Sequence, residues 1–249
     1  MLVLLPPSEG KTPARRGKPL DLGALTFPEL TETRRSVLEA VARVSARPDA
    51  LTALGVPPTL TAEVARNTLL ETAATAAAAK TYTGVLYGAL DLPTLDGPAR
   101  RRANRWLVVV SALFGAVRLG DRIPAYRLSM AVNVPPLGPL AAVWREPLAR
   151  VLPGAAGRGV IVDCRSSTYA AAWVPQGPLA RRWVHVRVPG ATHLAKHTRG
   201  LVTRHLVEVG LDVRTPRGVA EVVAGRFDVH LAEPTRPGQP WVLDAVARD

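Results

Sequence analysis

The chain has little sulfur and no long apolar run. Its single cysteine, Cys164, excludes an intrachain disulfide and is typical of a protein from a reducing compartment. The apolar run at the N-terminus stops at Pro6 and has no cationic segment before it, so we expect no signal peptide. No other run approaches the length of a membrane span. We therefore expect a cytoplasmic protein with no membrane partner.

Lysine is also scarce, although the chain is strongly basic. Of its 32 lysine and arginine residues all but four are arginine, and the formal net charge is +12. A field this positive favours polyanions or phosphorylated ligands as partners. Abundant arginine and alanine are also typical of a GC-rich genome, so the bulk charge alone does not decide between binding and solubility.

The length and the hydrophobic pattern indicate the fold class. At 249 residues and 47% hydrophobic the chain can form one large domain, and no linker-like tract divides it. Alternating strand and helix patterns predict a single α/β domain over residues 1–249, with a mixed sheet flanked by helices. Strands are expected at 1–5, 106–110, 159–164 and 183–188, with an antiparallel pair at 226–231 and 241–246. Helices are expected at 31–45, 61–79, 99–105, 139–152, 192–209 and 216–224.

The stretch from Trp106 to Met130 begins as a buried strand and then becomes densely polar. Five apolar residues end at Ser111, and the polar side chains that follow are Arg118, Asp121, Arg122, Tyr126 and Arg127. In α/β proteins ligands bind in the crevice at the carboxyl ends of strands. Pro124 indicates a rigid turn, which favours a ligand site over an ordinary polar loop.

The loop after the first predicted strand contains Gly-Lys-Thr, the end of a phosphate-binding P-loop. A P-loop needs a glycine where Leu5 stands and a helix where Pro13 stands, so we exclude an ATPase or GTPase loop. Ser8, Lys11 and Thr12 are still predicted to hold one phosphate or carboxylate, with a plain surface turn as the alternative.

A second polar segment, Asp163–Tyr169, follows another buried strand. Asp163 is predicted to act as a general acid or base, or to orient a polar ligand. Two interpretations remain open for Ser166 and Ser167: they bind phosphate or sugar hydroxyls, or they only cap the next helix. Cys164 alternates with Asp163, so we predict a buried and inert thiol.

The predicted helix at 192–209 carries a basic stripe and two histidines one turn apart. His193 and His197 have the spacing of helical metal ligands, but no carboxylate or cysteine accompanies them, so we predict no metal and no cofactor. Gly200 lets another backbone or a ligand approach closely. Phosphate or duplex backbone contacts are expected from Lys196, Arg199 and Arg204.

Together these segments resemble the YaaA-type peroxide stress protein family. The matching positions after the central strand are Ser111, Phe114, Gly115, Arg118, Asp121, Pro124, Tyr126, Arg127 and Met130. Further matches are the N-terminal MLVLLPPSEGKT, the triplet Tyr82-Thr83-Gly84, Trp144, the segment VDCRSSTYAAAW and the basic helix at 196–204. The chain departs from the family at Ala112, where glycine is usual, at Phe114, where many members have tyrosine, and in a shorter connection before the basic helix.

The resemblance covers nearly the whole chain and implies a YaaA-like fold. It also implies a role in limiting peroxide damage, with duplex DNA binding and reduced free iron as the associated behaviour. Direct iron binding is not indicated, because the sequence shows no ligand cluster of a suitable type.

The first function hypothesis is an enzyme that hydrolyses the N-glycosidic bond of a nucleoside monophosphate. It rests on the three polar segments that follow predicted strands, as a concave active site requires. The predicted catalytic residues are Asp163, Asp121 and Tyr126. The predicted ligand- or phosphate-binding residues are Ser8, Lys11, Thr12, Tyr82, Thr83, Ser111, Arg118, Arg127, Ser166, Ser167, Tyr169, Lys196 and Arg199.

The alternative hypothesis is a non-enzymatic DNA-binding protein of the oxidative stress response. The net charge predicts salt-dependent duplex binding, although no helix-turn-helix, zinc-finger or homeodomain pattern is legible. The candidate nucleic-acid contacts are Arg100, Arg101, Arg102 and Arg204. The sequence does not indicate an oligomeric state.

Overall fold

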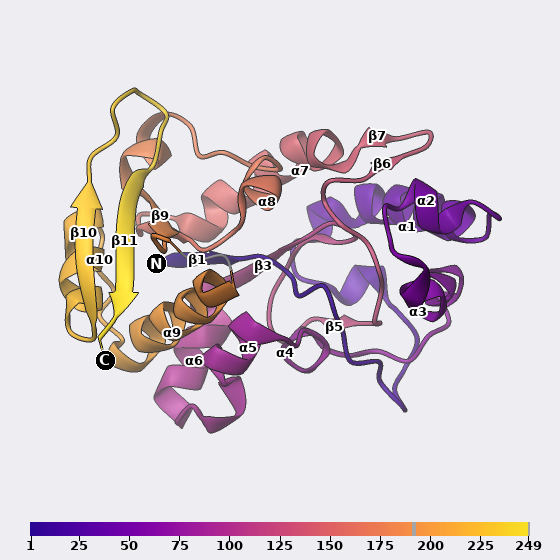
Figure 1. The fold of residues 1–249 in the computed structure, drawn as a ribbon, viewed down its shortest axis with the longest axis horizontal. Coiled ribbons are helices and arrows are strands. Elements are labelled where there is room, and N and C mark those ends of the chain that lie inside the picture. Colours follow the sequence, from indigo (N-terminus) through magenta and orange to yellow (C-terminus); the bar gives the residue numbers. More distant parts are fainter. Residues whose placement is uncertain (191–192, 249) are drawn as a thin grey trace.

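The computed structural model describes residues 1–190 and 193–248 and contains a seven-stranded mixed sheet flanked by helices (Figure 1). The strand order is β10-β11-β9-β8-β1-β3-β4. In chain order the strands are β1 (Leu2–Leu5), β3 (Leu107–Ser111), β4 (Gly115–Val117), β8 (Ile161–Asp163), β9 (Trp183–Arg187), β10 (Phe227–Ala232) and β11 (Trp241–Ala247). The five inner strands are parallel, and the edge strands β4 and β10 are antiparallel to their neighbours. The predicted α/β class with a mixed sheet is confirmed.

The helices and two short ribbons complete the fold. The α-helices are α1 (Thr31–Ser45), α2 (Ala50–Ala53), α3 (Thr61–Ala65), α4 (Ala78–Thr81), α5 (Val85–Leu90), α6 (Gly97–Trp106), α7 (Leu140–Ala156), α8 (Ser167–Ala170), α9 (His193–Val209) and α10 (Pro216–Ala224). Strand β2 (Ala76–Ala77) pairs with β5 (Arg122–Ile123), and β6 (Asn133–Val134) pairs with β7 (Gly138–Pro139). Short 3-10 helices lie at Leu22–Ala24, Pro28–Leu30, Pro58–Leu60, Arg66–Leu69, Leu92–Thr94 and Gly177–Arg182. No helix among the described residues is long and apolar enough to cross a membrane.

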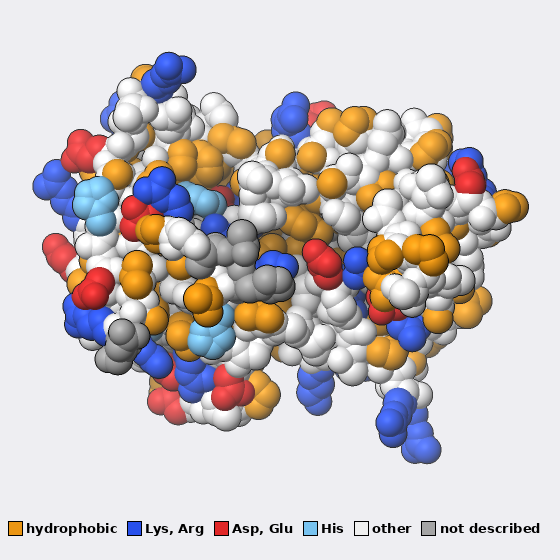
Figure 2. Space-filling model, viewed as in Figure 1, with side chains coloured by type: hydrophobic (Ala, Val, Ile, Leu, Met, Phe, Trp, Pro, Cys, Tyr) orange, Lys and Arg blue, Asp and Glu red, His pale blue; other side chains and the backbone are white. Residues whose placement is uncertain are grey.

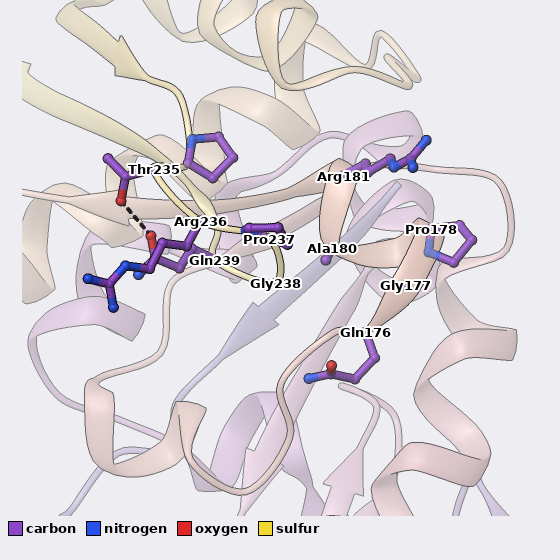
Figure 3. A pocket seen from close by; sticks show the side chains of 11 residues that line it. Gln176, Gly177, Pro178, Ala180, Arg181, Thr235, Arg236, Pro237, Gly238 and Gln239 are labelled. Carbon is purple, nitrogen blue, oxygen red and sulfur yellow. Dashed lines mark hydrogen bonds between the residues drawn. The ribbon is translucent and has the colours of Figure 1, made fainter.

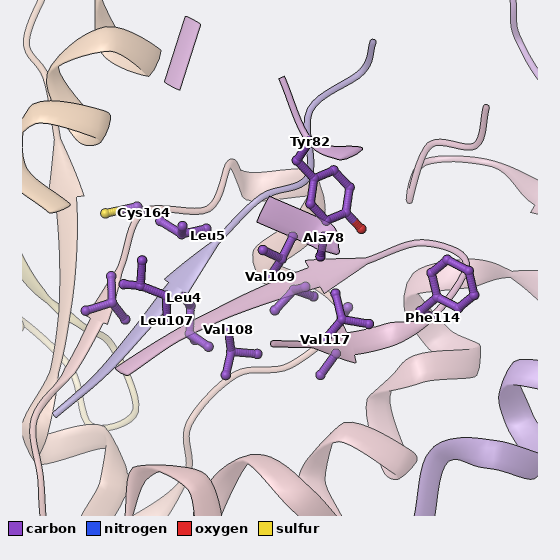
Figure 4. Close-up of a cluster of buried hydrophobic side chains, with 14 of the residues drawn as sticks. Leu4, Leu5, Ala78, Tyr82, Leu107, Val108, Val109, Phe114, Val117 and Cys164 are labelled. Carbon is purple, nitrogen blue, oxygen red and sulfur yellow. The ribbon is translucent and has the colours of Figure 1, made fainter. Parts of the chain in front are cut away.

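The centre of the sheet explains why three distant segments meet. All residues of strands β1 and β3 are buried, and apart from Ser111 at the end of β3 they are apolar, as expected of parallel strands covered on both faces. Val3 of β1 pairs with Leu107 of β3 on one side and with Val162 of β8 on the other. Figure 4 shows the apolar side chains of this region beside one another. The segments that follow β1, β3 and β8 therefore leave the sheet at the same edge.

Most predicted helix ends are confirmed. Helix α1 spans the predicted residues, and Asp96 caps α6 by accepting a hydrogen bond from the Ala99 N–H at 2.7 Å. Helix α9 ends before Gly210, whose φ of 75° suits a glycine C-cap. Helix α7 runs beyond the predicted end to Ala156. The predicted start of α9 at Thr192 lies outside the described residues.

The predicted helix at 61–79 is wrong. Helix α3 ends at Ala65, and the chain then passes through a 3-10 helix, strand β2 and the short α4. Asn67 is fully buried, and its side-chain amide exchanges hydrogen bonds with the backbone N–H and C=O of Arg127. These long-range hydrogen bonds override the helix propensity of the alanine-rich segment.

Candidate functional site

A cleft of about 280 Å³ lies at the carboxyl edge of β1 and β8, and we call it the Ser8 cleft. Its volume is close to the lower end of the range for small-molecule sites, about 300–1,000 Å³. Its walls come from the loop after β1, the start of α5, the segment after β8 and the N-terminal half of α9. The lining residues with polar side chains are Ser8, Glu9, Thr83, Tyr87, Cys164, Ser166, Tyr169, Lys196 and Arg199.

Hydrogen bonds connect the loop after β1 to the segment before α5. Pro6 and Pro7 lack N–H donors and therefore cannot extend β1. The Ser8 hydroxyl accepts from the Thr83 N–H at 3.0 Å, and the Tyr87 hydroxyl donates to the Pro6 carbonyl at 2.7 Å. These bonds fix one wall of the cleft and bring Ser8 and Thr83 together, as the predicted phosphate site requires.

Two cations lie beside this wall. The Nζ of Lys11 donates to the carbonyls of Ser8 at 2.8 Å and Glu9 at 3.2 Å, and it lies 4.0 Å from the ring centroid of Tyr126. Burial, together with the positive charge of Arg127, lowers the pKa of Lys11 to about 7. Arg127 in turn lies 3.6 Å from a carboxylate oxygen of Glu9.

Beneath Lys11 the hydroxyls of Ser111, Tyr126 and Tyr82 form a buried network. The Ser111 Oγ accepts from the N–H groups of Leu113 and Phe114, so its own proton is left for Tyr126, 2.7 Å away. Tyr126 and Tyr82 are 3.1 Å apart, and burial raises the pKa of both phenols. All three side chains are buried and none lines the Ser8 cleft, so they support Lys11 from below and do not meet a ligand directly.

Asp163 does not reach the cleft. Its carboxylate is fully buried and accepts two hydrogen bonds from the Arg165 guanidinium, at 2.8 and 2.7 Å, one from the Arg165 backbone N–H at 3.0 Å and one from the Trp183 indole at 3.0 Å. Burial by itself raises the pKa of this carboxyl, but the charge and hydrogen bonds of Arg165 outweigh it, and the net pKa lies below the ordinary value. The structure therefore makes Asp163 half of an internal ion pair and not the predicted acid or base.

Asp121 and Arg118 lie away from the cleft as well. The Asp121 carboxylate accepts from the N–H and hydroxyl of Thr26, at 2.9 and 2.8 Å, and from the Arg118 N–H at 2.8 Å. The Arg118 guanidinium donates to the Arg105 carbonyl. Both side chains fix the loop after β4, which corrects their predicted catalytic and ligand-binding roles.

Helix α9 contributes two of its predicted residues to the cleft. Lys196 is exposed, and Arg199 is half-buried with its Nε donating to the Val186 carbonyl at 3.0 Å. Arg204 instead donates to the carbonyls of Leu90 and Asp91 at the end of α5, so it is not available as the predicted nucleic-acid contact. At Gly200 the backbone of α9 touches the Leu86 carbonyl, which leaves no room for a side chain and confirms the predicted close approach.

The remaining residues of the β8 segment and of the β1 loop are placed as follows. Ser166 precedes α8 and lines the cleft without making a capping hydrogen bond, whereas Ser167 is exposed outside it. Cys164 is fully buried, and burial raises the pKa of its thiol to about 11, which agrees with the predicted inert cysteine. Thr12 lies on the far side of the loop, in a different groove.

Helix α6 uses most of its predicted DNA contacts internally. Arg102 donates to the carbonyls of Val207 and Glu208 at the end of α9, and Arg100 donates to the Pro93 carbonyl at 2.7 Å. Arg101 is exposed. Guanidinium groups that cap carbonyls are tied to the fold, so of this basic run Arg101 fits the predicted role best.

A second basic surface, which we call the Arg15 groove, is not among the features predicted from the sequence. It has a volume of about 360 Å³ and is lined by four cationic side chains, Arg15, Arg16, Lys80 and Arg122. Figure 2 shows cationic side chains projecting from the lower right edge, where Figure 1 places the loop after β1. The signal was present in the sequence as Arg15-Arg16 and Lys18, but the contributions of Lys80 and Arg122 depend on the β2–β5 pairing.

A larger concavity lies elsewhere. It measures about 760 Å³ and lies between residues 176–181 and 234–239, at the amino ends of β9 and β11 (Figure 3). Arg181 and Arg236 line it, but none of the predicted site residues does. In the described part of the chain there is no group of three His, Cys, Asp or Glu side chains that could hold a metal ion.

Fold and site together define an α/β protein with a basic, hydroxyl-lined cleft at the carboxyl edge of a mixed sheet. The family model of the peroxide stress protein YaaA matches residues 1–230, and the chain belongs to this family. It is 47% identical over 261 aligned residues to a UPF0246 protein of Streptomyces coelicolor, covering 100% of this chain and 99% of the relative. It is also 39% identical over 233 residues to a UPF0246 protein of Corynebacterium efficiens, covering 90% and 92% of the two chains.

Proposed function

We propose that this member of the peroxide stress family binds a nucleoside monophosphate, or a similar phosphorylated nucleotide, in the Ser8 cleft. The observation that carries the proposal is the meeting of cations and hydroxyls from four separate segments at one small cleft. Lys196 and Arg199 supply charge for a phosphate, and Ser8, Thr83 and Ser166 supply hydroxyls for phosphate or sugar.

The reaction that fits this cleft best is hydrolysis of the N-glycosidic bond. Such a step needs a carboxylate that activates water or stabilises the developing positive charge on the sugar. Of the described residues that line the cleft, Glu9 alone carries a carboxylate, so it replaces Asp163 and Asp121 in this role. Burial raises the pKa of Tyr169 to about 12, which keeps its phenol a neutral hydrogen-bond donor for the base.

The test incubates the purified protein with a panel of nucleoside monophosphates and nucleosides, and follows binding by calorimetry and free base by mass spectrometry. We expect binding of at least one monophosphate and base release that falls about a hundredfold or more in Glu9→Gln. Glu39→Gln, which removes an exposed carboxylate on α1, is the matched control and should leave both readouts unchanged. Failure of every monophosphate to bind would overturn the proposal; binding without base release would remove the hydrolytic step.

A second candidate function is DNA binding through the Arg15 groove. It is favoured by the four cations of the groove, none of which faces a carboxylate among the described lining residues, and by the net charge of +12. This surface takes over the role predicted for Arg100, Arg102 and Arg204.

Duplex binding measured by fluorescence anisotropy at several salt concentrations tests this function. The double change Arg15→Ser and Arg16→Ser should weaken binding and reduce the salt slope by roughly 1 to 2. The matched control changes Arg181 and Arg236, two exposed arginines at the opposite end of the strands, to serine. Equal effects of the two double variants would assign the binding to bulk charge instead of the groove.

A further inference from the structure

The two edges of the seven-stranded sheet differ in how their backbone groups are satisfied. Strand β4 forms one edge and is fully buried, and the Arg34 guanidinium donates to the carbonyls of Phe114 and Ala116 at 3.0 and 2.7 Å. The ring of Trp144 lies directly against Gly115 of the same strand. A buried arginine therefore occupies acceptors that a further strand would need, and this edge is closed.

In the described part of the chain, strand β10 at the other edge has no comparable protection. It is the outermost strand in Figure 1, with β11 as its neighbour on one side. Apart from the ladder to β11, no described residue forms a hydrogen bond with the backbone of Phe227–Ala232. The strand contains neither proline nor glycine and pairs with β11 without a bulge. Every second residue therefore presents its N–H and C=O outward, where another strand can pair with them.

The side chains of β10 alternate between two faces of the sheet. Phe227, Val229 and Leu231 pack against the hydrophobic core. Asp228 and His230 are exposed on the opposite face. Directly opposed residues of an antiparallel pair point to the same face, so an added strand must match this alternation.

A row of donors and acceptors crosses the exposed face and ends at this edge. Asp244 of β11 lies opposite Arg187 of β9 on one side and opposite His230 of β10 on the other. A carboxylate oxygen of Asp244 lies 2.6 Å from an Arg187 nitrogen and 3.9 Å from the His230 Nδ1. Because the row ends with an imidazole, whose ring N–H can donate, the next position outward suits a carboxylate.

We propose that β10 pairs antiparallel with β10 of a second copy of this chain, about a twofold axis at Val229. The strand supplies the carboxylate that the row lacks, since Asp228 then lies opposite the partner's His230. The Asp228 Oδ1 accepts from Arg248 of its own chain at 2.9 Å, and among the described residues no hydrogen bond ends on its Oδ2. By symmetry each contact of such an interface occurs twice.

The alternation of faces decides the register. An axis between two residues would oppose an exposed side chain to a core-facing one, so the axis must pass through a residue. An axis at Asp228 opposes two aspartates, and an axis at His230 opposes two histidines. The axis at Val229 avoids both, and it also places Phe227 opposite the partner's Leu231 on the core face. None of the β10 residues lines the Ser8 cleft or the Arg15 groove, so the surface is independent of both proposed ligand sites.

Sedimentation velocity of the whole protein at micromolar concentrations tests the pairing, and we expect a monomer–dimer equilibrium. Asp228→Lys opposes a lysine to a histidine, and His230→Glu opposes a glutamate to an aspartate. Each variant should therefore dimerise about tenfold more weakly than the wild type. Glu146→Lys makes the same charge change as Asp228→Lys at an exposed site on α7 and should leave dimerisation unchanged. Circular dichroism checks that all variants are folded.

An equimolar mixture of Asp228→Lys and His230→Glu is the sharpest test of the register. In the mixed dimer the introduced lysine faces the introduced glutamate, and the unchanged His230 faces the unchanged Asp228. The mixture should therefore dimerise about as tightly as the wild type. Amide hydrogen exchange gives a second readout: peptides that cover β10 should exchange more slowly when the dimer is populated, and peptides that cover β4 should not change.

A wild-type protein that stays monomeric over this concentration range would overturn the proposal. So would a dimer that Asp228→Lys and His230→Glu weaken no more than Glu146→Lys does, or one that leaves exchange in β10 unchanged. A mixture of the two variants that associates no more tightly than either alone would refute the pairing about Val229.

Discussion

The buried ion pair between Asp163 and Arg165 should stabilise the fold and take no part in catalysis. Asp163→Asn removes the negative charge and leaves a fully buried Arg165 guanidinium that still donates to the Tyr169 and Trp173 carbonyls, at 3.3 and 2.9 Å. Breaking a buried pair by removing one partner costs about 3–5 kcal/mol. Since ~1 kcal/mol shifts the melting temperature of a chain of this size by ~2–4 °C, we expect a loss of roughly 6–20 °C.

Thermal and urea unfolding followed by circular dichroism measure this effect. The control variant Glu146→Gln breaks the exposed ion pair on α7 in which a carboxylate oxygen of Glu146 lies 2.9 Å from the Arg150 guanidinium. It should change the melting temperature little. The folded-state pKa of Asp163 lies below its unfolded value, so its contribution to stability is present above the unfolded pKa and is lost as the pH falls through the folded one. The unfolding free energies of wild type and Asp163→Asn should therefore converge in acid.

The opposite pattern would refute this reasoning. If Asp163→Asn has the same melting temperature as the wild type but no longer releases base, Asp163 is a catalytic residue, as the sequence alone predicts. A variant that is less stable but still binds nucleotide below its melting temperature would support the structural role.

Three further predictions address the supports of the cleft. Ser111→Ala leaves two buried N–H donors without their acceptor and should lower the free energy of unfolding by about 1–3 kcal/mol in urea titrations. Gly200→Ala places a methyl group against the Leu86 carbonyl and should cost about 1–3 kcal/mol in the same assay; a neutral effect would mean that α5 and α9 separate freely. The pKa of Lys11 in the folded state lies below its value in the unfolded state. The unfolding free energy of the wild type should therefore rise relative to that of Lys11→Met as the pH increases from about 7 towards 10. A difference in unfolding free energy that does not change with pH would contradict the lowered pKa.

The parts of the fold that the sequence predicts well depend on local signals. Helix α1 and the starts of α6 and α10, which Asp96 and Thr215 cap, follow from side chains that act within a few residues of themselves. The segment at 61–79 fails because the position of Asn67 is decided by hydrogen bonds to Arg127, 60 residues away. No local pattern encodes such a contact.

The site shows the same division. The sequence pattern of polar segments after buried strands correctly predicts that Ser8, Ser166 and Lys196 lie at one cleft. They meet there because the carboxyl ends of parallel strands share one edge of the sheet. Which of those side chains point into the cleft depends on partners that the sequence does not name. For Asp163 one signal was available: Arg165 stands two residues later, on the same side of an extended chain, where it can pair with the carboxylate.

The most direct test of the central claim is calorimetric titration of the protein with a nucleoside monophosphate and with the matching nucleoside, repeated on Lys196→Glu. If the Ser8 cleft holds the phosphate, the monophosphate should bind about tenfold or more tightly than the nucleoside, and the charge reversal at exposed Lys196 should remove that preference. Equal affinity for the two ligands, or a preference that survives in Lys196→Glu, would contradict a phosphate site in this cleft.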